Sequence, residues 1–137
     1  MTTGFVFDAS TALAWCFKDE DSIDADRAQE QLIESWALEP RIWHAEVANG
    51  LVAGERRKRI DWPDLERSVA LLEAFDIRID PTEIRGRWMA LIQQARSHRL
   101  SLSDAIYLDL AVRERLPLAT VDSALARAAQ MVGVTLV

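Results

Sequence analysis

Short apolar runs alternate with longer amphipathic stretches along the whole chain. Apolar residues at every third or fourth position predict helices, and short apolar runs bounded by turn residues predict strands. The predicted strands span residues 5–7, 41–42, 77–79, 118–120 and 134–137. The predicted helices span residues 10–17, 24–36, 44–57, 63–72, 84–95, 102–115 and 123–132.

This alternation of strands and helices is typical of a parallel sheet that helices cover on both faces. No internal repeat, low-complexity tract or flexible linker interrupts it. The length of 137 residues suits one domain with its own core, so we expect residues 1–137 to form a single domain. The expected fold class is therefore α/β, with a central parallel sheet of four to five short strands.

The charge of the chain restricts the kinds of partner that it can have. Its 22 acidic residues outnumber 16 basic ones and give a net charge of −6. Domains that hold nucleic acid by bulk electrostatic attraction are usually basic, so a protein that coats nucleic acid is disfavoured. A nuclease is not excluded, because carboxylates that bind metal ions can account for part of the acidity.

The compartment can also be inferred from the sequence. The single cysteine, Cys16, cannot form an internal disulfide and fits a reducing compartment. The first residues lack the basic region and the long apolar stretch of a secretory signal. No apolar run approaches the roughly 20 residues that cross a bilayer. We therefore expect a cytoplasmic protein with no membrane contact.

Four acidic residues occupy positions at the ends of predicted strands or near the starts of predicted helices: Asp8, Glu46, Asp104 and Asp122. Each has a structural explanation when taken alone. Asp8 and Asp122 could cap the helices that follow them, and Glu46 could complement the dipole of its helix. Asp104 could complete a capping box with Ser101, three residues earlier.

Taken together, the four acids favour a metal site. The carboxyl ends of parallel strands meet at one edge of a sheet, where functional groups collect. Right-handed crossovers can bring the starts of two further helices to the same edge. Carboxylates that meet at one point raise one another's pKa, and a divalent metal with oxygen ligands is the simplest arrangement that lets them stay ionised. The chain is therefore a candidate metal-dependent enzyme.

Polar side chains flank the four acids. Ser10 lies two residues after the first acid and Thr120 two residues before the last, so either hydroxyl could orient a carboxylate or a bound water. Helix capping and strand propensity explain both residues equally well. Asn49 lies one turn after Glu46 on the same helix face, where we expect it to hydrogen-bond near the site.

One dense run of positive charge ends the third predicted helix. It consists of Arg56, Arg57, Lys58 and Arg59, and is called the basic run below. Such a run could stay solvated and complement the helix dipole. It could instead follow phosphates and help an acidic protein to hold RNA.

Four short segments surround the acids: residues 6–10 (VFDAS), 46–49 (EVAN), 102–105 (LSDA) and 119–122 (ATVD). In this order and at these separations they resemble the PIN-domain ribonucleases, specifically the VapC-type toxins of bacterial toxin–antitoxin pairs. The likeness extends over the whole chain. Each motif is short, and the specificity lies in the ordered set of four. Residues 61–99 match in pattern only.

The resemblance implies a three-layer α/β/α domain and an Mg²⁺- or Mn²⁺-dependent endoribonuclease. In that family the acids at these four positions build the metal site, so all four are expected to be catalytic. We assign Asp8 and Asp104 as principal metal ligands. Glu46 and Asp122 would bind a second metal or hold its waters. The metal would lower the pKa of a coordinated water, which hydrolyses an RNA phosphodiester bond.

The resemblance also implies three partners: an RNA substrate, a cognate antitoxin protein and a second copy of the chain in a homodimer. The five tryptophans are many for this length, and most are expected to pack in the core. One or two of them could anchor the homodimer or receive an antitoxin segment.

Two other functions stay open from the sequence. A PIN-like module could bind RNA or a protein without cleaving it, although the presence of all four acids argues against this. A phosphatase with an aspartyl nucleophile usually carries a second Asp two residues after the first, where this chain has Ser10. A cleavage assay with metal and an assay on small phosphomonoesters separate the three functions.

Overall fold

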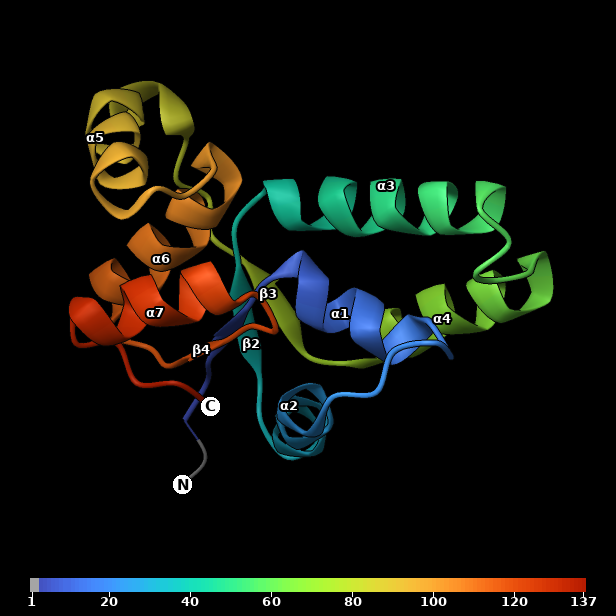
Figure 1. The fold of residues 1–137 in the computed structure, drawn as a ribbon. Helices are drawn as coiled ribbons and strands as arrows, with labels where there is room; N and C mark the ends of the chain where they lie inside the picture. The colour runs from blue at the N-terminus through green and yellow to red at the C-terminus, as the bar shows by residue number, and fades with distance from the viewer. Residues whose placement is uncertain (1–2) are drawn as a thin grey trace.

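A computed structural model describes residues 3–137 of the chain. Its elements are, in order, β1 (Val6–Phe7), α1 (Ala9–Cys16), α2 (Ile23–Ile33), β2 (Ala37–Glu39), α3 (Ile42–Arg56), α4 (Trp62–Ala74), β3 (Ile77–Ile79), the 3-10 turn η1 (Ile84–Gly86), α5 (Trp88–His98), α6 (Leu102–Glu114), β4 (Leu118–Ala119) and α7 (Ser123–Met131) (Figure 1). All seven predicted helices are present, although several boundaries differ. Across residues 3–137, no helix has both the length and the apolar character needed to span a membrane.

The strands form two parallel pairs, β1 with β4 and β2 with β3. A parallel bridge between Phe5 and Ala37 joins the pairs, so the strand order is β3-β2-β1-β4. A second parallel bridge places Leu136 beside Leu118 of β4. β1 therefore lies inside the sheet with a neighbour on each side. In open parallel sheets, functional groups lie beyond the carboxyl ends of the strands, so the carboxyl end of β1 is the expected place for a site.

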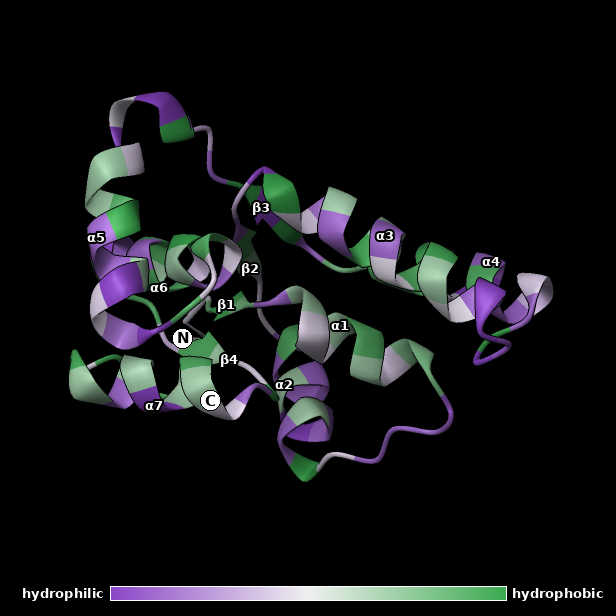
Figure 2. Ribbon diagram, turned by 45° about the horizontal axis from the view of Figure 1, so that its top comes forward, coloured by the Kyte–Doolittle hydropathy of each residue, from purple (hydrophilic) through white to green (hydrophobic). Residues whose placement is uncertain are grey.

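Helices cover both faces of this sheet (Figure 1). On one face α1 packs against α2, α3 and α4, and on the other α6 packs against β1, α5 and α7. Phe5, Val6 and Phe7 are fully buried between the two layers, and β1 and β4 have the green colour of apolar residues in Figure 2. The expected three-layer α/β/α fold with a central parallel sheet is confirmed.

The second strand lies before Pro40, so the strand predicted at residues 41–42 is wrong. β2 ends at Glu39, and Arg41 already has helical dihedral angles (φ −56°, ψ −27°) just before α3. Proline keeps the residue before it extended and cannot donate to a sheet ladder, so the extended run precedes it. The helix predicted from residue 44 would place Glu46 in its first turn, and this is wrong: α3 begins at Ile42, so Glu46 lies in the second turn.

The helix predicted over residues 24–36 ends at Ile33, because Trp36 belongs to the approach to the sheet. The Trp36 carbonyl accepts a hydrogen bond from the Phe5 N–H at 3.2 Å. The Trp36 ring lies so close to Gly4 that a Cβ atom there would come within 2.4 Å of it. Only glycine fits at this crossing, where Trp36 lies beyond the end of α2.

Two other predicted elements are only partly right. The helix predicted over residues 84–95 is divided into η1 and α5, which starts at Trp88. Gly86, a poor helix former, lies at the break. The strand predicted over residues 134–137 is a single bridge, reached after Gly133 turns the chain out of α7 with φ +82°.

Two glycines let α3 cross closely over α1. A Cβ atom at Gly50 would come within 2.3 Å of Leu13, and one at Gly54 within 2.5 Å of Phe17. Residues four apart share one face of a helix, and Glu46 lies one turn before Gly50 on this face. The crossing therefore directs Glu46 toward the N-terminal end of α1, where the chain leaves β1.

Candidate functional site

Asp8 follows β1 directly and is 4% exposed. Its Oδ1 atom accepts hydrogen bonds from the Ser10 hydroxyl at 2.8 Å and from the Thr11 amide at 3.1 Å, so Asp8 does cap α1. Its Oδ2 atom accepts from the Thr120 hydroxyl at 2.7 Å. Burial raises the pKa of Asp8, and these hydrogen bonds offset part of the rise. The carboxylate is therefore held in one orientation by donors from both α1 and the end of β4.

Asp122 is linked to Asp8 by a residue that hydrogen-bonds to both, Thr120. The Thr120 hydroxyl that donates to Asp8 accepts a hydrogen bond from the Asp122 N–H at 3.0 Å. The Oδ1 atom of Asp122 caps α7 by accepting from the amides of Ala124 at 2.8 Å and Leu125 at 3.1 Å. The capping interpretation is thus correct for both aspartates. It uses only Oδ1 of Asp122 and leaves Oδ2 for another role.

Glu46 is held by a residue that the sequence analysis missed. The Tyr107 hydroxyl donates a hydrogen bond to Oε1 of Glu46 at 2.6 Å. Burial and this bond raise the pKa of Tyr107, so its proton stays in place as the donor. One signal was available, because Tyr107 lies one turn after Asp104 and a buried tyrosine usually has a hydrogen-bond partner.

Asp104 lies in the first turn of α6, where its N–H donates to the Ser101 hydroxyl at 3.1 Å. No hydrogen bond within residues 3–137 joins its carboxylate to another element of the fold. Burial raises the pKa of Asp104 above its ordinary value. The charge of Asp122 raises the pKa further, the Ser101 hydroxyl offsets part of the rise, and the charges of Asp8 and Glu46 add to it. The four acids, from four separate parts of the chain, therefore share one electrostatic environment.

The carboxylate oxygens of the four acids suit a hard divalent cation. Oδ2 of Asp122 and Oε2 of Glu46 accept no hydrogen bond within residues 3–137 and keep free lone pairs. The Asp104 carboxylate interacts only with the Ser101 hydroxyl among these residues and also keeps lone pairs for a metal. Among the same residues, no three Asp, Glu, His or Cys side chains are arranged to hold one ion. Mg²⁺ is usually bound by one or two carboxylates and keeps several waters, so a group of three is not required. The all-oxygen donors fit Mg²⁺ or Mn²⁺.

The three flanking polar residues differ in their placement. Ser10 and Thr120 both contact Asp8 directly. Asn49 is exposed on α3, and no side-chain hydrogen bond within residues 3–137 involves it. The structure therefore brings Ser10 and Thr120 to the carboxylates and leaves Asn49 outside the hydrogen-bonded network.

The basic run lies at the far end of α3. From Glu46 to Arg56 the helix advances about 15 Å, at 1.5 Å per residue. The first three residues of the run are exposed. Arg59 forms ion pairs with Asp19 at 2.9 Å and with Glu20 at 3.1 Å. Three of the four cations are therefore accessible to a ligand, at a distance from the carboxylates.

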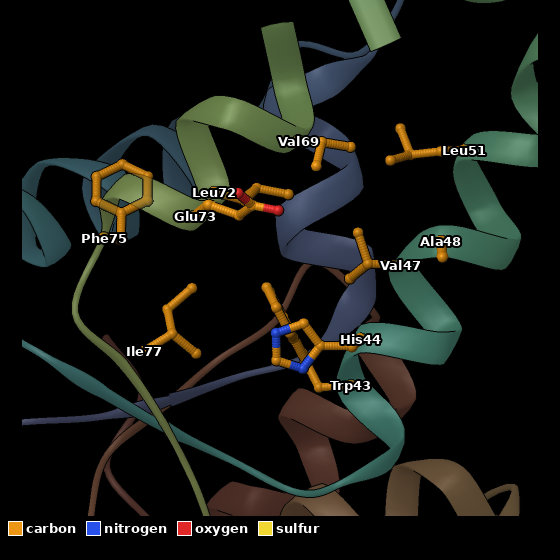
Figure 3. Close-up of a pocket in the computed structure, with 10 residues that line it drawn as sticks. All are labelled: Trp43, His44, Val47, Ala48, Leu51, Val69, Leu72, Glu73, Phe75 and Ile77. Atoms are coloured by element: carbon orange, nitrogen blue, oxygen red, sulfur yellow. The ribbon is translucent and has the colours of Figure 1, made fainter. Parts of the chain in front are cut away.

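Two hollows on the surface differ in character. An apolar groove of about 570 Å³ lies between α3 and α4, with Val47 and Leu51 on one wall and Val69 and Leu72 on the other (Figure 3). None of the four acids lines it. A more polar hollow of about 420 Å³ includes Thr120, Asp122 and Arg127 in its lining. The polar hollow adjoins the carboxylate site, and the apolar groove is a separate surface.

Comparison with known proteins agrees with this geometry. The PIN domain family matches residues 5–131, a range that contains all four acids. No curated protein matches the sequence. The crystal structure of PAE2754 from Pyrobaculum aerophilum is similar in fold, with a TM-score of 0.63 and 20% sequence identity over 93% of this chain and 87% of that one. Because the family match extends over most of its length, this chain belongs to the PIN domain family.

Proposed function

We propose that this chain is a metal-dependent endoribonuclease and the toxin of a VapC-type toxin–antitoxin pair. PIN domains are generally metal-dependent nucleases. The observation that carries the proposal is the convergence of the four acids. Thr120 joins Asp8 to Asp122, and Tyr107, one turn after Asp104 in α6, holds Glu46. The charges of Asp122, Asp8 and Glu46 accordingly raise the pKa of Asp104. A cation that binds among these groups relieves their repulsion.

The four acids would share the work of binding metal. Asp8 and Asp104 would be the principal ligands, and Glu46 and Asp122 would bind a second ion or its waters. When bound, Mg²⁺ or Mn²⁺ lowers the pKa of a coordinated water and stabilises the charge that builds on the phosphate. The role of the chain is to keep the carboxylates ionised, oriented and close to the scissile bond.

Hydrogen bonds prearrange two of the acids before any ligand arrives. Thr120 and Ser10 hold the two oxygens of Asp8, and Tyr107 holds one oxygen of Glu46. Partners of this kind typically change metal affinity or activity by about 10- to 100-fold when they are removed.

Exposed cations would hold the RNA. The polar hollow that includes Asp122 also includes Arg127, which supports a contact to a phosphate next to the cleaved bond. The basic run, at the far end of α3, would contact the strand farther from the cut. Such contacts add affinity without reading the base sequence.

Neutralising the three accessible cations of the basic run should weaken RNA binding and flatten its dependence on salt. In the triple variant Arg56→Gln, Arg57→Gln, Lys58→Gln, the slope of log K against log salt should fall by up to about 2, at about 0.7 for each lost contact to a single strand. Binding is measured on protein that also carries Asp104→Asn, so that the RNA stays intact.

A matched control for this experiment is Arg67→Gln. Arg67 is exposed and already paired with Asp64, so its removal should leave the slope unchanged. An unchanged slope in the triple variant would show that the basic run is only a solvated helix end.

Two apolar surfaces support the protein partners of a toxin. The groove between α3 and α4 supports docking of an antitoxin segment (Figure 3). On α5, Trp88, Met89 and Ile92 are 62%, 58% and 44% exposed, which supports a homodimer through this helix. Activity on cellular RNA and a single buried cysteine support a cytoplasmic location.

The test of the proposed function is cleavage of purified RNA. The protein should cut total RNA internally in the presence of Mg²⁺ or Mn²⁺, and a chelator should stop the reaction. A module that only binds would retain RNA without shortening it, and a phosphatase would release phosphate from small monoesters, which we do not expect here. RNA that stays intact with either metal would contradict the proposal.

A further inference from the structure

β2 contains a buried carboxyl group that the proposed catalysis does not use. Glu39 is 0% exposed. Its Oε1 atom accepts a hydrogen bond from the Phe7 N–H at 2.8 Å. Its Oε2 atom has no hydrogen-bond partner within residues 3–137. A buried polar atom without a partner destabilises a folded protein. Residues that break the rules of core packing in this way are expected at functional sites.

The Glu39 side chain takes the place of a backbone hydrogen bond in the sheet. Between β1 and β2, the Phe5 N–H donates to the Trp36 carbonyl and the Leu38 N–H donates to the Phe5 carbonyl. In a regular parallel ladder the next bond would join the Phe7 N–H to the Leu38 carbonyl. The Phe7 N–H binds the Glu39 carboxyl instead. The last connection between the two strands is therefore made by a side chain.

This connection lies next to the candidate ligand Asp8. Phe7 directly precedes Asp8, whose own N–H donates to the carbonyl of Ala119, the last residue of β4, at 3.2 Å. On the opposite side, the Glu39 carbonyl accepts from the Asp80 N–H at 2.8 Å. The end of β1 is thus held between β4 and the Glu39 carboxyl. The Glu39 carboxyl therefore joins the end of β1 to β2.

Electrostatic effects place Glu39 close to the other parts of the site. Burial raises the pKa of Glu39 well above its ordinary value, and the charge of Asp8 raises it further. The pKa of Tyr107 is raised by burial, by its bond to Glu46 and also by Glu39. Glu39 therefore lies near both the carboxylate of Asp8 and the residue that holds Glu46.

We propose that Glu39 is a positioning residue for Asp8: its carboxyl replaces the last backbone hydrogen bond between β1 and β2 and fixes the strand end that carries Asp8. The effect on catalysis rests on the proposed function, whereas the effect on the strand does not. The role requires a hydrogen-bond acceptor of this length at position 39. Glutamine supplies such an acceptor, and leucine has a similar volume without one.

The test compares Glu39→Leu with Glu39→Gln in the full chain. In the leucine variant the Phe7 N–H can bond to the Leu38 carbonyl, which closes the regular ladder and moves Asp8. We expect kcat for RNA cleavage to fall roughly 10- to 100-fold, because a misplacement of about 1 Å can cost about 100-fold. KM should change little. Glu39→Gln should restore kcat to within about threefold of the parent protein, since its amide oxygen accepts from the same N–H.

A second readout separates positioning from a general loss of structure. Because Glu39→Leu removes a buried carboxyl oxygen without a partner, its unfolding temperature should equal or exceed that of the parent protein. An unfolding temperature that falls together with kcat would overturn the proposal, and so would full activity in the leucine variant. Glu30→Leu removes an exposed glutamate of α2 and should leave both quantities unchanged.

A third readout does not depend on catalysis. The rate of hydrogen exchange at the Phe7 amide should differ between Glu39→Leu and the parent protein, and Glu39→Gln should have the parent's rate. The Val6 amide donates to the Pro117 carbonyl on the other side of β1, so its exchange rate should be unchanged in both variants. If the parent protein cleaves no RNA, the proposed function fails and this measurement still tests the ladder. Unaltered exchange at Phe7 in the leucine variant would contradict the positioning role directly.

Discussion

Asp104→Asn should abolish RNA cleavage and leave the fold intact. Within residues 3–137 the Asp104 carboxylate interacts with the Ser101 hydroxyl of its own helix start, which an asparagine oxygen can still accept. The cap of α6 uses the Asp104 N–H, so the substitution keeps the structural contacts. It also removes one of four charges that repel one another. We expect activity to fall by much more than about 100-fold, which is the upper effect of removing a partner that only orients a ligand.

The measurement is the rate of RNA cleavage beside the unfolding temperature without added metal. That temperature should stay equal or rise in Asp104→Asn. Asp21→Asn removes an exposed aspartate from the loop after α1 and serves as the control with normal activity. Asp104→Asn protein that cleaves RNA at a near-normal rate would remove Asp104 from the site.

Asp8→Asn should also abolish cleavage, with a structural effect in addition. Both oxygens of Asp8 accept hydrogen bonds, from Ser10 and Thr11 on one side and from Thr120 on the other. An amide nitrogen cannot accept any of them, and one buried donor left without a partner costs about 1–3 kcal/mol. Asp104→Asn is therefore the cleaner test of the metal site.

Mg²⁺ or Mn²⁺ should stabilise the protein against heat, because the ion binds the folded carboxylates and not the unfolded chain. At about 100 times the dissociation constant, a ligand adds about 2.7 kcal/mol to the free energy of unfolding. For a domain of this size that corresponds to a rise in unfolding temperature on the order of 10 °C. The temperature is measured with each metal and again after a chelator has removed it.

The decisive comparison is the same titration on Asp104→Asn, in which the rise should be much smaller. An equal rise in both proteins would mean that the stabilising ion binds elsewhere. If metal concentrations that support cleavage raise the unfolding temperature of neither protein, the four acids do not bind the ion tightly, and tight binding there is not needed for catalysis. This experiment needs no RNA, so it tests the metal site independently of the substrate.

Much of the candidate site follows from local sequence, because strand ends and helix starts are local features. Asp8 and Asp122 lie where a predicted strand gives way to a helix, and both indeed cap helices. Glu46 was harder to place, since its direction depends on Gly50 and Gly54. These glycines allow the close packing of α3 on α1, a contact between distant segments that the sequence pattern does not reveal.

Contacts between distant residues could not be predicted from the sequence. Tyr107 meets Glu46 across 61 positions of the chain, and Glu39 meets Phe7 across 32. Nothing near Glu39 in the sequence signals burial of its carboxyl, because an isolated glutamate before a proline is normally exposed. Arg59 likewise belongs to an ion-pair network with Asp19 and Glu20, which removes it from the free cations of its run.

The amino-acid sequence by itself determined the alternation of helices and strands, the layered fold and the acids at the strand ends. These depend on periodicity, capping and turn chemistry, which act over a few residues. The tertiary structure alone decided that β2 ends at Glu39, which hydroxyls hold Asp8, and which buried groups have no partner. Hydrogen-bond partners and burial arise when segments far apart in the chain pack together, and a linear pattern contains no distances between such segments.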